Sequence, residues 1–131
     1  MVRSTALCIA LFALSFCVGV RAEEAKHEDT LKKIIASMTE IGNLLEAAKD
    51  VDTAKETEPK LLEAVKAFKA NDAEMRKLPE PPKELNDELQ KKYEPLLNTA
   101  MAKMQKESER ITKAPDIAKE LAESMKLLGS N

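Results

Sequence analysis

Three methionines in the C-terminal half have the clearest potential for chemistry. Met101 and Met104 lie about one helical turn apart, and Met125 would come beside Met104 if a last helix folded back at Pro115. Thioether sulfur is a soft ligand that suits Cu(I). Methionine at helical spacing is also common filler in aliphatic cores. We interpret Met101, Met104 and Met125 as core residues, and a copper site is the alternative.

His27 is the single histidine of the chain. Together with Glu24 it has the Glu-x-x-His spacing of di-iron helical bundles, but such a site needs a second pair and two further glutamates. We therefore predict that His27 lies at a terminus and binds no metal.

Catalytic residues are not expected elsewhere. Acyl-transfer hydrolases need a nucleophile activated by a base, and beyond residue 22 the chain has no cysteine and one imidazole. The carboxylate pairs Glu23–Glu24 and Glu107–Glu109 are predicted to lie on solvated helix faces, where their acidity is ordinary. The sequence thus predicts a protein that is not an enzyme and has no cofactor.

Two segments carry apolar residues at intervals of three and four, which predicts helices over 26–49 and 53–77. Thr53 and Glu56 fit a capping box at the start of the second helix. Pro59 leaves two possibilities, a helix that begins near Glu58 or one that bends at the proline. The predicted buried residues are Leu31, Ile34, Ile35, Met38, Ile41, Leu45 and Ala48, and then Leu61, Leu62, Val65, Phe68 and Met75.

Three prolines within residues 78–82 predict an extended corner before a third helix over 82–112. We expect a kink at Pro95, inside that helix. Pro115 should open a shorter helix that stops at Gly129. The predicted buried residues are Leu85, Leu89, Tyr93, Leu96, Leu97, Ala100, Met104 and Ile111, and then Ile117, Leu121, Met125 and Leu128.

Amphipathic helices with short connections favour antiparallel neighbours. The sequence therefore predicts an all-α fold: an up-and-down bundle of three long helices and one short C-terminal helix, forming a single domain over 23–131. The alternative is an elongated pair of helical hairpins that completes its core by dimerising.

Residues 1–22 have the features of a cleavable signal peptide. Arg3 precedes an apolar run over 6–20, and Val20 and Ala22 are small residues at the positions that a signal peptidase inspects. The run is shorter than the roughly 20 residues that span a bilayer. We predict an exported protein, periplasmic or extracellular, with no stable membrane insertion after cleavage. A retained anchor and lipidation at Cys17 are the alternatives.

Both cysteines lie within residues 1–22, so the predicted mature chain of 109 residues has no disulfide. It holds 19 basic and 23 acidic side chains, a net charge of −4 with His27 neutral. The two signs alternate along the chain without a basic stripe, which argues against nucleic acid and against anionic lipid as partners.

Two resemblances add to this interpretation. Met38 in the first helix and the turn Pro81-Pro82-Lys83 after the second are similar to periplasmic b-type four-helix cytochromes, whose haem iron is held by a methionine and by a histidine of the last helix. Only Met38 matches, because no histidine follows His27. The chain more closely resembles uncharacterised small exported helical proteins of planctomycete-type bacteria, through the segments Asp52-Thr53-Ala54-Lys55, Pro59-Lys60-Leu61, Lys92-Tyr93-Glu94-Pro95, Ala100-Met101 and Arg110-Ile111.

We expect from all this an exported helical protein that acts by contact with an unknown protein partner or with a second copy. Leu44 and Leu127, which lie beside the main apolar stripes, are the candidate contact residues. The alternatives are a bundle that binds a small ligand or soft metal, and a periplasmic holdase.

Overall fold

The computed structural model describes the backbone of residues 2–130 and the side chains of residues 22–130. The backbone forms five helices and, within 2–130, no strand. The prediction of an all-α fold is therefore confirmed. The helices are α1 (Val2–Ala47), α2 (Val51–Lys77), α3 (Lys83–Thr112), α4 (Pro115–Glu120) and α5 (Ala122–Gly129).

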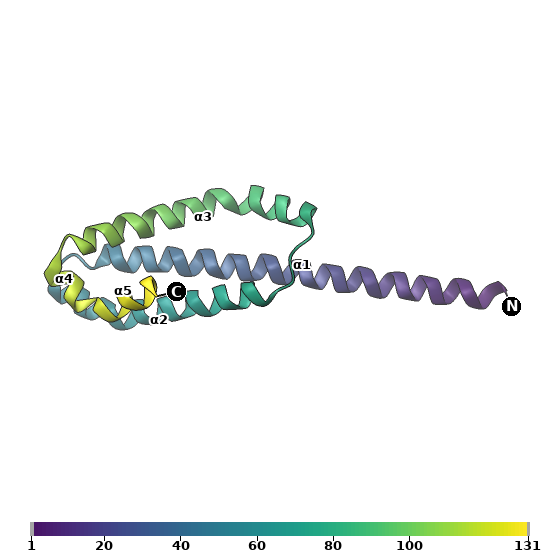
Figure 1. The fold of residues 1–131 in the computed structure, drawn as a ribbon, viewed down its shortest axis with the longest axis horizontal. Helices are drawn as coiled ribbons and strands as arrows, with labels where there is room; N and C mark the ends of the chain where they lie inside the picture. The colour runs from purple at the N-terminus through teal and green to yellow at the C-terminus, as the bar shows by residue number, and fades with distance from the viewer. Residues whose placement is uncertain (1, 131) are drawn as a thin grey trace.

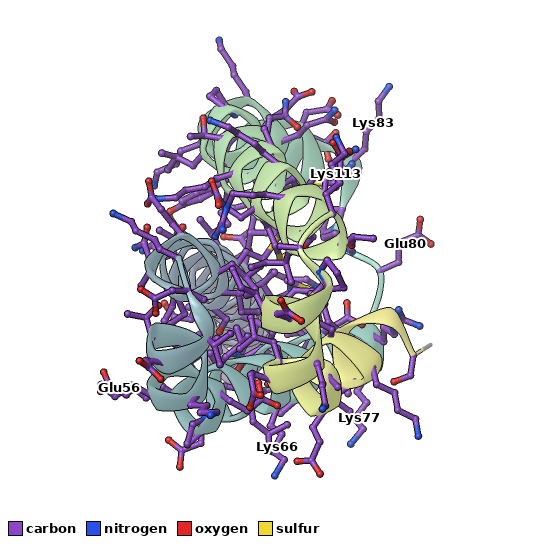
Figure 2. The ribbon with its side chains drawn as sticks, turned by 90° about the vertical axis from the view of Figure 1, so that its left-hand side faces the viewer. Glu56, Lys66, Lys77, Glu80, Lys83 and Lys113 are labelled. Atoms are coloured by element: carbon purple, nitrogen blue, oxygen red, sulfur yellow. The ribbon has the colours of Figure 1, made fainter. Side chains whose placement is uncertain are left out.

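The three long helices run up and down, and α1 lies between α2 and α3 (Figure 1). The chain then turns back, and α4 and α5 lie against α2. We call the end that holds the α1–α2 turn the closed end, and the end that holds residues 78–82 the open end. Viewed from the closed end, the labelled charged side chains Glu56 and Lys66 point away from the bundle (Figure 2).

Helix α1 begins much earlier than the predicted residue 26. It runs without a break through the predicted cleavage position after Ala22 and extends beyond the other helices (Figure 1). No proline precedes Pro59 in the sequence, so no residue of that type interrupts the helix. The side chains of Cys8 and Cys17 lie outside the described residues.

The turn between α1 and α2 is set by Asp50 rather than by Thr53. The Asp50 carboxylate accepts from the Thr53 amide at 2.8 Å, and the Thr53 hydroxyl accepts from the Asp50 amide at 3.0 Å. This is a reciprocal capping box with threonine in the place that glutamate usually takes. The predicted box of Thr53 and Glu56 is therefore wrong, and α2 starts at Val51.

Both internal prolines are accommodated within continuous helices. Pro59 lies in the ninth position of α2, so a helix start near Glu58 is wrong. Pro95 lies within α3, which follows a bowed course (Figure 1). Both rings are exposed, so the carbonyl groups that lose their amide partners face solvent.

The last helix is divided in two, where we expected one. The break lies at Leu121, whose φ and ψ of −99° and 14° are not helical. The first amides of a new helix lack partners within that helix. One of them, the Ser124 amide, donates a hydrogen bond to the Glu58 carboxylate of α2 at 3.1 Å. Leu121 itself is fully buried, so the break turns this side chain into the core.

The core is richest at the closed end. There Ile41 and Leu45 of α1, Leu61 of α2, Ile111 of α3 and Leu121 form one buried cluster. A smaller cluster of Ile34, Met38 and Ala100 lies between α1 and α3, toward the open end.

Three leucine side chains lie elsewhere than predicted. Leu96, expected in the core, is 55% exposed. The seam of α3 follows 93, 97, 100, 104, 107 and 111, and Leu96 lies beside this alternation of three and four. Leu44 and Leu127, expected as contact residues on the surface, pack against the core of the closed end.

Candidate functional site

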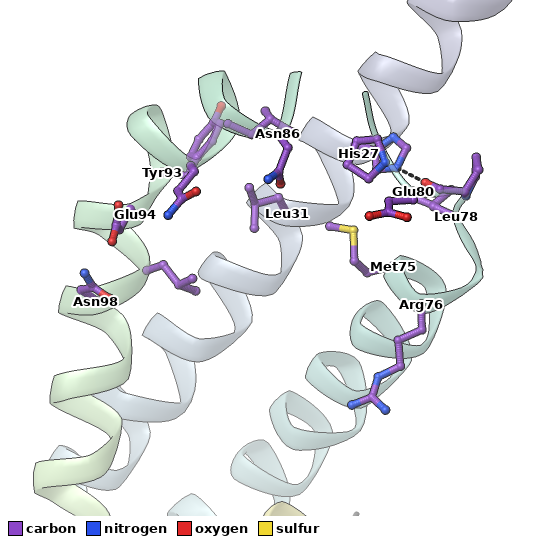
Figure 3. A pocket seen from close by; sticks show the side chains of 15 residues that line it. His27, Leu31, Met75, Arg76, Leu78, Glu80, Asn86, Tyr93, Glu94 and Asn98 are labelled. Atoms are coloured by element: carbon purple, nitrogen blue, oxygen red, sulfur yellow. Dashed lines mark hydrogen bonds between the residues drawn. The ribbon is translucent and has the colours of Figure 1, made fainter. Parts of the chain in front are cut away.

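An open cleft lies at the open end of the bundle, between α2 and α3 and above α1 (Figure 3). Its volume is about 620 Å³. It is lined by His27 and Leu31 of α1, Met75 and Arg76 of α2, residues 78–81, and α3 residues including Leu89, Tyr93 and Leu97. Three further hollows within residues 22–130 have volumes of about 320, 240 and 60 Å³.

The cleft exists because the fourth position of the bundle is only partly filled. No Cα atom of α2 lies within 8 Å of one of α3, so a space runs between these helices opposite α1. At the closed end, α4 and α5 fill it and contribute Ile117 and Leu121 to the core. Helix α5 ends at Gly129, well short of residues 78–82 (Figure 1). The remainder of the space is the cleft.

The walls of the cleft combine an apolar floor with a polar rim. Leucine and methionine side chains supply the floor, and the rim is mixed in charge, with Arg76 on the α2 side and Glu94 and Asn98 on the α3 side (Figure 3). Such a lining binds an apolar surface and orients it through its polar margin. The floor residues are Leu31, Met75, Leu78, Leu89 and Leu97.

His27 lies at the rim of this cleft and is 5% exposed. Its Nε2 atom is 2.7 Å from the Pro79 carbonyl oxygen, and its Nδ1 atom is 2.8 Å from that of Glu23 (Figure 3 shows one of these bonds). The prediction that His27 is a frayed terminal residue is therefore wrong. Helical periodicity could not reveal a partner 52 residues away in an irregular segment.

A second polar cluster joins α1 to α3 next to the cleft. The Glu28 carboxylate accepts from Lys92 at 2.7 Å and from the Tyr93 hydroxyl at 2.5 Å. These hydrogen bonds, first that of Lys92 and then that of Tyr93, lower the pKa of Glu28 from about 4.5 to about 2. The cluster holds Tyr93, a wall residue of the cleft, in place.

This lowered pKa predicts a loss of stability in acid. A carboxyl group with a lower pKa in the folded state stabilises that state above its unfolded value, and the contribution disappears as the pH falls from about 4.5 to 2. Glu28→Gln should therefore lower the urea midpoint at pH 7, and its difference from the wild type should shrink at about pH 2.5. Lys92→Met should behave in the same way. A difference that stays constant over this range would contradict the assignment.

Glu107 was predicted to be solvated, and that prediction is wrong. Glu107 is 7% exposed, and its carboxylate accepts a hydrogen bond from Arg110 Nε at 2.7 Å. Arg110 also donates to the carbonyl groups of Leu45 and Ala48 at the end of α1. The pair belongs to the closed end and takes no part in the cleft.

The methionines of the copper hypothesis are in different surroundings. Met101 is 49% exposed on α3, so its interpretation as a core residue is wrong. Met104 and Met125 do pack against the core of the closed end, as expected. Met38, the residue shared with the cytochrome pattern, is 4% exposed within the α1–α3 cluster. Among the described residues, no three or more histidine, cysteine, aspartate or glutamate side chains are grouped so that they could hold a metal ion.

Over the described part of the chain, no helix combines the length and the apolar character that crossing a membrane requires. No family model, no curated protein and no solved structure matches this chain.

Proposed function

We propose that this protein acts by contact, and that its cleft binds an amphipathic helix of another polypeptide. In this proposal the protein catalyses no reaction and works after export, as the signal-peptide pattern of residues 1–22 suggests. The described residues bring no nucleophile–base pair into the cleft, so the proposal assigns it recognition alone.

The partly filled fourth position of the bundle supports this proposal most strongly. Along the closed half of that position the chain already places an amphipathic helical segment, α4–α5, whose apolar side turns toward α1, α2 and α3. The cleft continues the same space between the same helices. A helix with aliphatic residues at intervals of three and four would cover the apolar floor just as α5 covers the closed end.

The rim suggests what the polar side of such a partner carries. Arg76 and Glu94 lie on opposite sides of the opening, so a helix with both acidic and basic side chains is favoured over one of a single charge. The volume of about 620 Å³ also falls within the range of small-molecule pockets, which favours a small apolar ligand as the second candidate.

A labelled peptide tests the proposal. A synthetic peptide of about 18 residues, long enough to form a helix, would carry leucine on one face and alternating lysine and glutamate on the other. Fluorescence anisotropy should show saturable binding. Leu89→Glu places a charge on the floor and should weaken binding at least tenfold, because one leucine contact is worth about 1.5–3 kcal/mol.

The matched control is Leu96→Glu, the same change on the exposed side of the same helix. It should leave the affinity unchanged. Equal losses in both variants would contradict binding in the cleft. Binding of a small apolar dye that Leu89→Glu abolishes, with no binding of the peptide, would favour the small-ligand candidate instead.

A further inference from the structure

The cleft has room for only part of the helix proposed above as its ligand. Its lining on α3 runs from Asn86 to Asn98, which is about 18 Å along the helix axis. A helix of about 18 residues is about 27 Å long, so it either extends beyond the open end or takes part of the space that α5 occupies. An overhanging end would leave leucine side chains in water, which favours the second arrangement.

Helix α5 is not deeply embedded in that space. Among the three long helices, α2 alone has Cα atoms within 8 Å of those of α5 over the described backbone. Met125, Leu127 and Leu128 pack against the core of the closed end, yet each of them is only partly buried. The break at Leu121 joins α5 to α4, so α5 can move without bending a continuous helix.

The most buried side chain of α5 is polar and lacks a partner. Ser124 is fully buried, and its Oγ atom makes no hydrogen bond with any described residue. The same holds for Oε2 of Glu58, whose other carboxylate oxygen accepts a hydrogen bond from the Ser124 amide. A buried polar group without a partner disfavours the state that buries it, by a factor of about ten in the equilibrium constant. The contact between α5 and α2 is therefore weaker than its apolar side chains alone would make it.

A surface contact holds the end of α5. Lys69 of α2 donates hydrogen bonds to the carbonyl and hydroxyl groups of Ser130. Both bonds are exposed to solvent, so they add little to the docking of α5.

We infer that the helix-binding surface of this protein includes the place of α5, and that α5 is a resident segment that a partner helix replaces. The cleft and α5 together extend over about 30 Å, so the partner is an amphipathic helix of about 20 residues with aliphatic side chains along its whole length. Helix α5 leaves by turning at Leu121, and α4 stays because it contacts both α2 and α3. The partner named here rests on the proposed function, whereas the weak docking of α5 is a property of the free protein.

The docking of α5 can be measured in the free protein by hydrogen exchange. Amides of residues 122–129 should be at least tenfold less protected than those of residues 34–45, because α5 opens by itself. Ser124→Ala removes the unpartnered hydroxyl and should slow exchange in residues 122–129 about tenfold. Lys69→Met removes the contact at Ser130 and should speed it about threefold. Equal protection of the two segments, or exchange that Ser124→Ala leaves unchanged or accelerates, would overturn the weak docking of α5.

The 18-residue peptide described above tests the replacement. When it binds, the amides of residues 122–129 should lose protection, whereas binding over an intact α5 would preserve or raise it. The matched control is a 12-residue peptide with the same leucine stripe, held helical by a lactam bridge on its polar side. It is about 18 Å long and fits the cleft alone, so it should leave that protection unchanged.

The same variants should change the affinity for the longer peptide only, because α5 competes with that peptide alone. Ser124→Ala should weaken its binding about tenfold, and Lys69→Met should strengthen it about threefold. Binding of the 18-residue peptide with undiminished protection of residues 122–129 would overturn the replacement of α5 and leave the cleft as the binding site. Failure of both peptides to bind would defeat the proposed function and the partner named here, even where the two substitutions change exchange in the free protein as expected.

Discussion

Replacing Arg110 with methionine should lower the free energy of unfolding by about 3 kcal/mol, or about 10 °C or more in melting temperature. The guanidinium donates at 2.6 Å and 3.0 Å to the carbonyl groups of Leu45 and Ala48, at the end of α1. Helix α1 has no basic residue in its own last turn, so Arg110 supplies from α3 the positive charge that the end of a helix favours. Its loss also leaves the buried Glu107 without its partner.

A second substitution separates two causes of the lost stability, the missing contacts of Arg110 and the unpaired charge of Glu107. Arg110→Met combined with Glu107→Met removes both members of the pair, and stability should recover in part. The control is Arg76→Met, because the Arg76–Asp72 pair lies on the surface, with the arginine side chain 79% exposed. Its effect should stay within about 0.5 kcal/mol. Chemical denaturation of the wild type and the three variants measures these free energies of unfolding. A double variant less stable than Arg110→Met would contradict the role assigned to the pair.

The arrangement of helices was predictable because it depends on local patterns. The stripe of Ile34, Met38, Ile41 and Leu45 repeats at three and four, and this repeat alone fixes which side of α1 faces the other helices. The proline cluster of residues 78–82 likewise marks the end of α2, and the single Pro115 marks the start of α4. The exact start of α2 was not predictable in this way. Asp50 and Thr53 are both residue types that suit the position before a helix, and only the hydrogen bonds between them show that Asp50 takes it.

The cleft was not predictable from the same patterns. Leu31 and Leu89 were expected in the core because they continue the apolar stripes, and they do lie on the inner sides of α1 and α3. They line an open space because α5 ends before it reaches them. The spacing of apolar residues shows which side of a helix is buried, but it does not show how far a neighbouring helix extends along that side. His27 was misjudged for a related reason, since its burial depends on Pro79, a residue distant in sequence.

The second large effect is expected from Leu121→Ala, which should cost about 3 kcal/mol. Leu121 is fully buried at the break between α4 and α5, where it joins the cluster formed by all three long helices. Helix α5 is also held by Met125, Leu127 and Leu128, which pack against this cluster. Its polar contacts lie at its two ends, where Glu58 accepts from its first turn and Lys69 donates to the carbonyl and hydroxyl groups of Ser130. The cavity left by the substitution should therefore weaken the docking of α5 before it weakens the contact of α1 with α2.

Hydrogen exchange distinguishes this local loss from a general one. Amides of residues 115–129 should lose more protection in Leu121→Ala than those of residues 34–45, because α4 and α5 can detach while the long helices stay packed. Leu96→Ala is the matched control: it makes the same chemical change at a side chain that is 55% exposed, and it should cost less than about 0.5 kcal/mol. If protection falls equally in both regions, α5 folds as one unit with the long helices, and its place in the fourth position is permanent. If α5 alone is released, the apolar space that it covers becomes continuous with the cleft, as expected if both halves of that position are suited to a helix.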